Sequence, residues 1–179
     1  MTSNNIPEIH VLRQLLRYDP STGLLFWKER KSCPQFSARY AGKEALTSVR
    51  HGYRYGEIFN KPVSAHRVAF TIYYGKHPNG EIDHINGDRS DNRISNLRDV
   101  TRTINARNMK KSVANKSGVT GVSFYKASAK WQSRIMANGK YLHLGYFDNF
   151  EDAVSARKKA EETFGYHPNH GRIPVGAMG

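Results

Sequence analysis

The residues whose types could do chemistry together gather in the middle of the chain. Asp83 and His84 are adjacent, and Asn96 and Asn105 follow within one short stretch. A neutral imidazole can take a proton from an attacking water near pH 7, and an Asn side chain that accepts from its ring N–H would hold the right tautomer. A carboxylate and an amide oxygen suit Mg²⁺ or Mn²⁺, which neutralises charge on a phosphate and on a leaving oxygen. The set could therefore support metal-assisted hydrolysis of a phosphodiester.

Three elements must position these residues. Residues 80–85 predict a short strand, the turn formers of 86–92 predict a loop, and residues 93–97 would close the hairpin. Thr101 can cap a helix that runs to about Met109. Because neighbouring strand residues point to opposite faces, Asp83 and His84 share a site only if the strand is distorted or the metal lies at its edge.

The flanking segments carry weaker patterns. Residues 9–18 predict an amphipathic helix, 24–27 a buried strand, 28–41 a polar and turn-rich stretch, 53–58 and 62–64 a hairpin, and 65–74 a helix. Beyond the site, residues 119–125, 130–137 and 140–147 predict three strands, with a strong hairpin signal at Asn138-Gly139. A helix follows and ends at Gly165.

The composition points to a polyanionic partner. Twenty-eight Lys and Arg face 15 Asp and Glu, which gives a net charge of +13 and a pI near 10.0. Nucleic acid is favoured over a membrane as that partner. With Cys33 as the single cysteine, no internal disulfide and no cysteine-based zinc site can form. The sequence shows no signal-peptide or membrane-spanning pattern, so we expect a cytoplasmic protein.

The central residues resemble a known family. The runs Asp83-His84-Ile85-Asn86-Gly87-Asp88 and Asp91-Asn92-Arg93-Ile94-Ser95-Asn96-Leu97-Arg98 resemble the signature of HNH endonucleases found in bacteriophages and in intron-borne homing enzymes. The resemblance includes His66-Arg67-Val68-Ala69-Phe70 and covers about residues 17–109. It implies a ββα-metal core, a single Mg²⁺ (or Mn²⁺) ion, and products with a 5′-phosphate and a 3′-hydroxyl.

The same resemblance implies a role for each central residue. His84 would be the general base, and Asn96 would orient it and support the loop. Asp83 and Asn105 would be the metal ligands. Asn92 is interpreted as a structural turn residue, and His66 as a packing residue or a phosphate contact.

A second resemblance covers about residues 117–164. Gly121-Val122, Lys130-Trp131, Arg134-Ile135, Leu144-Gly145-Tyr146-Phe147 and Glu151-Asp152-Ala153 resemble the AP2 domain, which lays a three-stranded sheet in the major groove of DNA. Ser123 and Tyr125 stand where plant members place arginines, and His143 replaces a tryptophan, so base specificity stays open. For Trp131, core packing and DNA contact are equally favoured. The candidate DNA-binding residues are Lys110, Lys111, Lys126, Lys130, Trp131, Arg134, Lys140 and His143.

These expectations describe an α+β chain. A ββα-metal nuclease domain would span 1–109 (core about 53–109), followed by a basic linker at 110–116, an AP2-like three-stranded antiparallel sheet with a helix at 117–165, and a tail at 166–179. The expected function is a metal-dependent nicking or homing endonuclease of a phage or mobile element. It would act in a bacterial host cell on double-stranded DNA, as a monomer rather than a dimer.

Two other classes of function remain open. The first is a non-enzymatic DNA-binding regulator that kept a nuclease scaffold, against which the intact set Asp83, His84, Asn96 and Asn105 argues. The second is an RNA-binding protein, against which the narrow major groove of A-form RNA argues.

Overall fold

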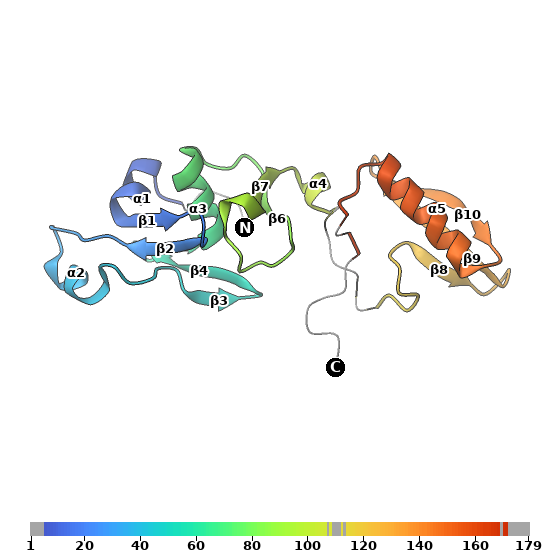
Figure 1. Cartoon of the computed structure of the whole chain (residues 1–179), viewed down its shortest axis with the longest axis horizontal. Helices are drawn as coiled ribbons and strands as arrows, with labels where there is room; N and C mark the ends of the chain where they lie inside the picture. The colour runs from blue at the N-terminus through green and yellow to red at the C-terminus, as the bar shows by residue number, and fades with distance from the viewer. Residues whose placement is uncertain (1–5, 107, 109–111, 113, 169, 172–179) are drawn as a thin grey trace. The chain divides into compact units, whose positions relative to one another are not determined.

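The computed structural model describes residues 6–106, 108, 112, 114–168, 170 and 171. The chain forms two compact units, Met1–Arg102 and Thr103–Gly179, each described by itself below (Figure 1). The candidate DNA-binding residues Lys110 and Lys111 lie outside the described residues, as does Met109, the predicted helix end. In the described parts of the chain, no helix has both the length and the apolar character needed to cross a membrane.

The first unit alternates short helices with small antiparallel sheets. It contains α1 (Ile9–Leu15), β1 (Leu16–Asp19), β2 (Leu24–Trp27), α2 (Pro34–Tyr40), β3 (Ser48–Arg50), β4 (Tyr53–Ile58), β5 (Lys61–Ser64), α3 (Ala65–Tyr74), β6 (Glu81–His84), the 3₁₀ turn η1 (Ile94–Asn96) and β7 (Leu97–Val100). The sheets are β1-β2, β3-β4-β5 and β6-β7. Helix α4 (Arg102–Ala106) begins at the last residue of this unit.

Helix α3 is the centre around which the first unit packs. Its fully buried Val68 joins a cluster with residues of α1, β1 and β2, including Leu12, Leu16 and Leu25. Ala69 and Phe70 form a second cluster with Ile82 of β6 and Leu97 of β7. Burial of apolar side chains on both sides of one helix therefore holds the β6–β7 hairpin against the rest of the unit.

Several predicted boundaries in the first unit are corrected. The first helix ends at Leu15 because Leu16–Asp19 pairs with Leu24–Trp27 as a strand instead. Residues 34–40, expected to be turn-rich loop, form α2, with Pro34 in its first turn. The returning strand of the hairpin begins later than predicted, because residues 94–96 form the 3₁₀ turn η1 and the pairing strand β7 runs from Leu97 to Val100. Strand β3 was not predicted.

The second unit is a three-stranded antiparallel sheet with one helix. Strands β8 (Val122–Tyr125), β9 (Lys130–Ala137) and β10 (Lys140–Phe147) lie in the order β10-β9-β8, and α5 (Phe150–Thr163) follows. The predicted strands and helix are confirmed, although β8 begins at Val122. Asn138 and Gly139 both have positive φ, as a tight hairpin turn requires. The whole is a mixture of helices and small sheets, compatible with the expected α+β class.

Candidate functional site

His84 is the last residue of β6, and its side chain is almost fully buried. Its Nε2 lies 3.0 Å from Oδ1 of Asn92, which is also buried. Because an amide oxygen only accepts, this contact assigns the proton to Nε2, and in the neutral ring the lone pair is then on Nδ1. Burial lowers the pKa of His84, against the opposing effects of the Asn92 hydrogen bond and of nearby carboxylates. The neutral ring is the form that a general base needs.

Asn96 was expected to orient His84, but the structure places Asn92 at the imidazole. Asn96 Oδ1 accepts from the backbone N–H of Asn86 at 2.9 Å, and its Nδ2 donates to the carbonyl of Asp91 at 2.8 Å. With both amide atoms engaged by backbone, Asn96 fixes the loop that carries Asn92. The sequence interpretation missed the role of Asn92 because an Asn in a turn-rich run usually bonds nearby backbone.

The loop between β6 and η1 is held by its own carboxylates. Asp88 Oδ1 accepts from the backbone N–H of Ser90 at 2.9 Å, and Asp91 forms an ion pair with Arg93 at 2.6 Å. The hydrogen bonds from Arg93 lower the pKa of Asp91 to about 2. At neutral pH these groups are charged, and the loop has a defined shape.

The turn between β1 and β2 supports the same loop from outside. The hydroxyl of Tyr18 donates to the Asn92 carbonyl at 2.7 Å, and the Ile94 N–H donates to the Pro20 carbonyl at 3.2 Å. Gly23 has φ +77°, and a Cβ built there would lie 2.5 Å from backbone atoms of Asn92 and Arg93. Only glycine allows this close approach. The β1–β2 turn therefore fixes the residue that contacts His84.

Aromatic rings surround the imidazole. The ring of His66, on α3, packs edge-on to His84 with centroids 5.3 Å apart, and the ring of Tyr53 lies 5.2 Å from His66 and 5.8 Å from His84. Among the described residues, the buried Nδ1 of His66 has no hydrogen-bond partner. Burial, with smaller contributions from His84 and Arg67, lowers the pKa of His66 to about 3. His66 is therefore neutral beside His84.

The carboxylate of Asp83 is buried and ion-paired. Arg98, its cross-strand partner on β7, places Nε at 2.8 Å and a terminal nitrogen at 2.7 Å from Asp83 Oδ2. Within the part of the chain that is described, no group of three or more His, Cys, Asp or Glu side chains could hold a metal ion. A Mg²⁺ ion commonly takes only one or two carboxylates and completes its shell with water and phosphate. The buried carboxylate of Asp83 is a hard oxygen donor of the kind that Mg²⁺ prefers.

The predicted site residues are divided between the two units. Asp83, His84 and Asn96 lie on neighbouring elements of the first unit. Asn105 lies on α4, within the second unit. The structure thus brings three of the four residues together.

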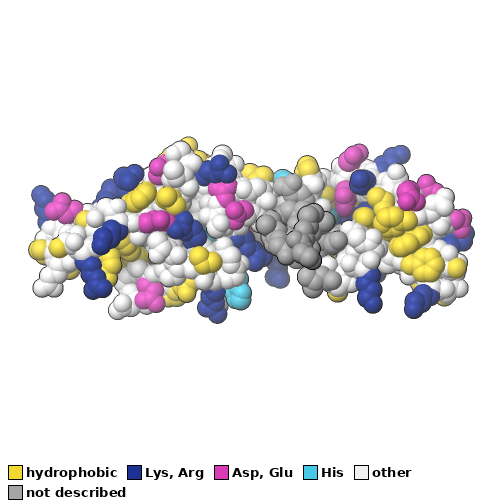
Figure 2. Space-filling view, turned by 60° about the horizontal axis from the view of Figure 1, so that its bottom comes forward, with side chains coloured by type: hydrophobic (Ala, Val, Ile, Leu, Met, Phe, Trp, Pro, Cys, Tyr) yellow, Lys and Arg dark blue, Asp and Glu magenta, His cyan; other side chains and the backbone are white. Residues whose placement is uncertain are grey.

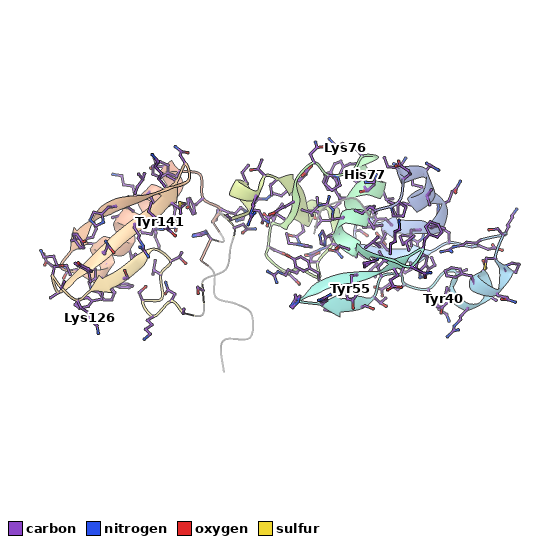
Figure 3. The ribbon with its side chains drawn as sticks, turned by 180° about the vertical axis from the view of Figure 1, so that it is seen from behind. Tyr40, Tyr55, Lys76, His77, Lys126 and Tyr141 are labelled. Atoms are coloured by element: carbon purple, nitrogen blue, oxygen red, sulfur yellow. The ribbon has the colours of Figure 1, made fainter. Side chains whose placement is uncertain are left out.

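The second unit exposes one face of its sheet, because α5 packs on the other. Cross-strand pairing places Ser123 beside Gln132, Tyr125 beside Lys130 and Arg134 beside His143 on this open face. The guanidinium of Arg134 lies 5.1 Å from the centre of the Tyr141 ring, and Tyr146 packs against both Tyr125 and His143. Lys126 and Tyr141 mark the two ends of this sheet in Figure 3. The open face therefore combines cations with exposed aromatic rings.

The candidate DNA contacts do not all lie on the open face. Trp131 packs its ring 4.7 Å from Phe150 at the start of α5, and Lys140 pairs with Ala137, on the face that α5 covers. Lys130 lies on the open face but forms an ion pair with Asp148 at 3.1 Å. For Trp131, packing against the helix is thus the observed role. Side chains alternate between the two faces along each strand, and this alternation divides the candidate residues between the open face and the face that α5 covers.

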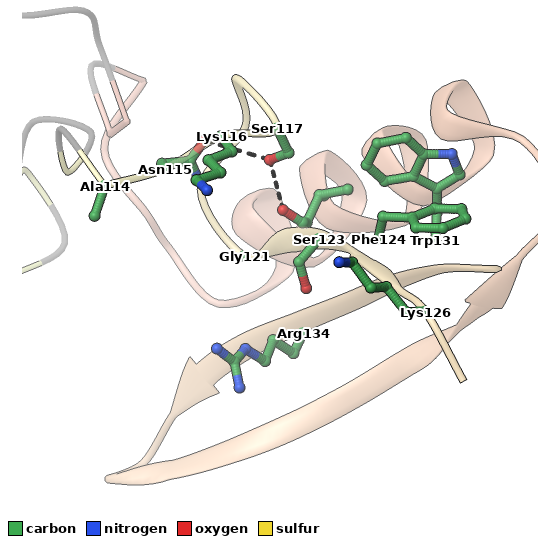
Figure 4. A pocket seen from close by; sticks show the side chains of 11 residues that line it. Ala114, Asn115, Lys116, Ser117, Gly121, Ser123, Phe124, Lys126, Trp131 and Arg134 are labelled. Atoms are coloured by element: carbon green, nitrogen blue, oxygen red, sulfur yellow. Dashed lines mark hydrogen bonds between the residues drawn. The ribbon is translucent and has the colours of Figure 1, made fainter. Parts of the chain in front are cut away.

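A groove runs beside the edge strand β8. It has a volume of about 490 Å³ and brings Lys116, Lys126 and Arg134 near Ser123 and Phe124 (Figure 4). Ser117 Oγ shapes its rim by donating to the carbonyl of Val122 at 2.6 Å. Lys126 and Arg134, both candidate DNA contacts, thus lie at the edge of the sheet and on its open face.

Comparisons with known proteins match the part of the chain that contains His84. The sequence model of the HNH endonuclease family matches residues 63–107, which include α3, β6, β7 and α4. Protein 3.8 of Escherichia phage T7 is 34% identical over 108 residues, which is 60% of this chain and 89% of the phage protein. No solved structure matches the chain significantly. The chain belongs to the family of phage T7 protein 3.8, and it contains an HNH endonuclease domain at residues 63–107.

Proposed function

We propose that the protein is a divalent-metal-dependent DNA endonuclease of a phage or mobile element, with His84 as its general base. The observation that carries the proposal is the hydrogen bond between His84 Nε2 and Asn92 Oδ1 inside the matched domain. It keeps the imidazole lone pair on Nδ1, where it can accept a proton. The HNH domain implies a nuclease, and DNA is the substrate that this domain implies.

The chemistry follows from this tautomer. A water oxygen attacks the scissile phosphorus while His84 Nδ1 takes the water proton, and the bond from phosphorus to the 3′ oxygen breaks. The products carry a 5′-phosphate and a 3′-hydroxyl, whose proton comes from solvent. Asn92 stabilises the imidazolium that forms, because its oxygen still accepts from Nε2–H.

Asp83 is the residue of the first unit that would help to hold the single ion, Mg²⁺ or Mn²⁺. Asn105, the second ligand that the family resemblance implies, lies in the other compact unit. Nucleases of this family typically use a divalent metal, which supplies positive charge at the phosphate and at the leaving oxygen. Arg98 orients Asp83 through its contact with Oδ2. The positive charge of Arg98 also limits how much anionic charge a cation would find there.

The second unit would act as the DNA-holding part, with an AP2-like sheet. Its open face offers Lys130, Arg134 and His143 for phosphates or base edges, with Tyr125 beside them. Lys126 and Lys140 would add phosphate contacts around the sheet. Lys110 and Lys111, which lie outside the described residues, are further candidate contacts by their charge. A tethered binding unit raises the local concentration of the nuclease at DNA. A monomer with one such site would most simply nick one strand.

A supercoiled-plasmid assay with Mg²⁺ or Mn²⁺ tests the proposal, beside an EDTA control and the His84→Ala variant. We expect metal-dependent conversion to open circle by the wild-type chain. The variant should still retard DNA on a gel but should cut at least 10²-fold more slowly. If His84→Ala cut DNA as fast as the wild-type chain, His84 would not be the general base. DNA binding with no cutting under either metal would favour the regulator over the enzyme.

A further inference from the structure

Helix α2 is a regular element that contributes nothing to a core. None of its residues, Pro34–Tyr40, is buried. Short helices are marginal in water, and most of the stability of protein helices comes from burying an apolar face. This helix must therefore be held by other contacts.

An arginine and three aromatic rings fasten α2 to the end of β2. The guanidinium of Arg30 lies 3.8 Å from the centre of the Phe36 ring and 5.2 Å from that of Trp27. Phe36 packs edge-on to Trp27 at 5.4 Å and against Tyr40 at 4.8 Å. Ser37 Oγ accepts from the Arg30 backbone N–H at 2.7 Å. These contacts fix the helix on the surface without covering it.

The fastened segment is strongly basic. Between Lys28 and Lys43 the sequence has five Lys or Arg and one acidic residue, Glu29. Lys31, Arg39 and Lys43 are exposed, and among the described residues no salt bridge joins them to a carboxylate. Figure 2 shows dark blue side chains at the end of the first unit that holds α2. We call Lys31, Arg39 and Lys43 the α2 patch.

The α2 patch is far from the candidate catalytic hairpin within the first unit. Helix α2 and the β6–β7 hairpin lie at opposite ends of that unit (Figure 1). Tyr40, at the end of α2, lies at the outer end of the unit when seen from behind (Figure 3). A polyanion bound at both places would extend along the length of the unit.

We propose that the α2 patch is a second DNA-binding surface, which contacts the phosphate backbone of the substrate duplex away from the scissile bond. The charge complementarity carries this choice of partner, because exposed cations that are not neutralised by carboxylates displace condensed counterions when they meet phosphates. The proposal rests on the proposed nuclease function. It gives a function to a part of residues 1–50 that has no part in the proposed chemistry of the catalytic hairpin.

The test uses the full chain with two charges removed. Lys31→Ala/Arg39→Ala should weaken duplex binding on the order of tenfold at 100 mM salt and reduce the slope of log K against log salt by about 2. The matched control is Lys158→Ala/Lys159→Ala, which removes two exposed charges from α5, on the covered side of the second unit's sheet. The control should change neither quantity by more than a small fraction.

Cys33 allows a second measurement that needs no variant. It is exposed, is the single cysteine, and directly precedes α2, so an iron chelate attached there generates radicals only near the patch. We expect strand scission of a bound duplex at sugars several base pairs from the enzymatic cut. Scission should disappear when excess unlabelled protein competes for the duplex.

The outcomes separate the two proposals. If the wild-type chain neither binds nor cuts DNA, the proposed function fails and this inference fails with it. If it cuts normally while the double variant keeps wild-type affinity and salt slope, and the Cys33 chelate leaves the duplex intact, only the α2 patch is refuted. Tighter binding of single-stranded RNA than of duplex DNA at the patch would also overturn it.

Discussion

The imidazole of His84 is held by Asn92, and the residue type of Asn92 alone does not predict this role. The ring contact comes from Asn92, eight positions along the chain, while the side chain of Asn96 bonds to loop backbone. The two amides therefore do different work on the same loop. Substitution of each one separates orientation of the imidazole from support of the loop.

Asn92→Ala should lower kcat for plasmid nicking by roughly 10- to 100-fold, because the imidazole loses the acceptor that fixes its tautomer. KM for DNA should stay near the wild-type value, since Asn92 is buried away from the surface. Asn96→Ala should instead lower thermal stability first, because it leaves two backbone groups of the loop without partners. A larger loss of kcat in Asn96→Ala than in Asn92→Ala, at equal folding, would reverse these assignments.

His66 makes stability depend on pH. Its folded-state pKa of about 3 lies below the unfolded value near 6.5, so the unfolded chain binds more protons below pH 6.5. Its contribution to stability is complete above that pH and is lost progressively as the pH falls toward 3. The groups that face it are His84 on β6 and Tyr53 on β4, with Arg67 beside it on α3.

His66→Phe should remove this dependence. Between pH 7 and pH 5 the wild type should lose about 1 to 2 kcal/mol more free energy of unfolding than the variant. At pH 7 the variant should be as stable as the wild type or more so, because an unpartnered buried nitrogen is removed. Urea unfolding at a series of pH values measures both quantities. Parallel stability curves for the two proteins would show that His66 titrates normally.

At the scale of elements, the β1–β2 turn fixes the position of the loop between β6 and η1, which carries Asn92. Gly23 meets the backbone of Asn92 and Arg93 at a distance that no side chain tolerates, and Tyr18 bonds the Asn92 carbonyl. The two segments are far apart in the sequence. Their contact explains why residues before 53 belong to the folded nuclease unit.

Gly23→Ala should lower kcat at least tenfold, because the displaced Asn92 backbone moves the amide away from His84. The matched control is Gly42→Ala, where φ is also +77° but nothing lies within 4 Å of the new Cβ. Both variants should lose about 1 to 3 kcal/mol from backbone strain, so stability alone does not distinguish them. The rate of nicking at saturating DNA distinguishes them. Equal kcat in the two variants would show that the β1–β2 turn does not position the catalytic residues.

At the scale of the whole molecule, we propose that nuclease chemistry and DNA holding belong to different compact units. The first unit contains the His84 site, and the second presents an open sheet face with Lys130, Arg134 and His143. Because each unit has its own core, changes on the sheet surface should not disturb the chemistry.

Lys130→Ala/Arg134→Ala/His143→Ala should raise the Kd for duplex DNA and reduce the salt slope by about 2, because two cations are removed. The rate of nicking at saturating DNA should be unchanged. Fluorescence anisotropy over a range of salt concentrations measures binding, with Lys158→Ala/Lys159→Ala as the charge-matched control. A variant that binds as the wild type does would mean that the open face does not hold the DNA.

The sequence by itself predicted candidate residues for the chemistry and determined which segments form most elements. Asp83, His84 and Asn96 could be found by type and spacing, and strands such as 24–27 and 130–137 by local patterns. These signals are local, since hairpin turns and alternating side chains act over a few residues. The net charge of +13 likewise needed no structure.

Only the tertiary structure decided which groups meet. The choice of Asn92 over Asn96, the pairing of Asp83 with Arg98 and the orphaned nitrogen of His66 all arise from contacts between segments that sequence patterns do not connect. The same holds for residues 16–18, which were predicted as the end of a helix and instead pair with the β2 strand Leu24–Trp27. Packing between distant segments outweighs local preference, and it placed α2 on the surface with its charges exposed.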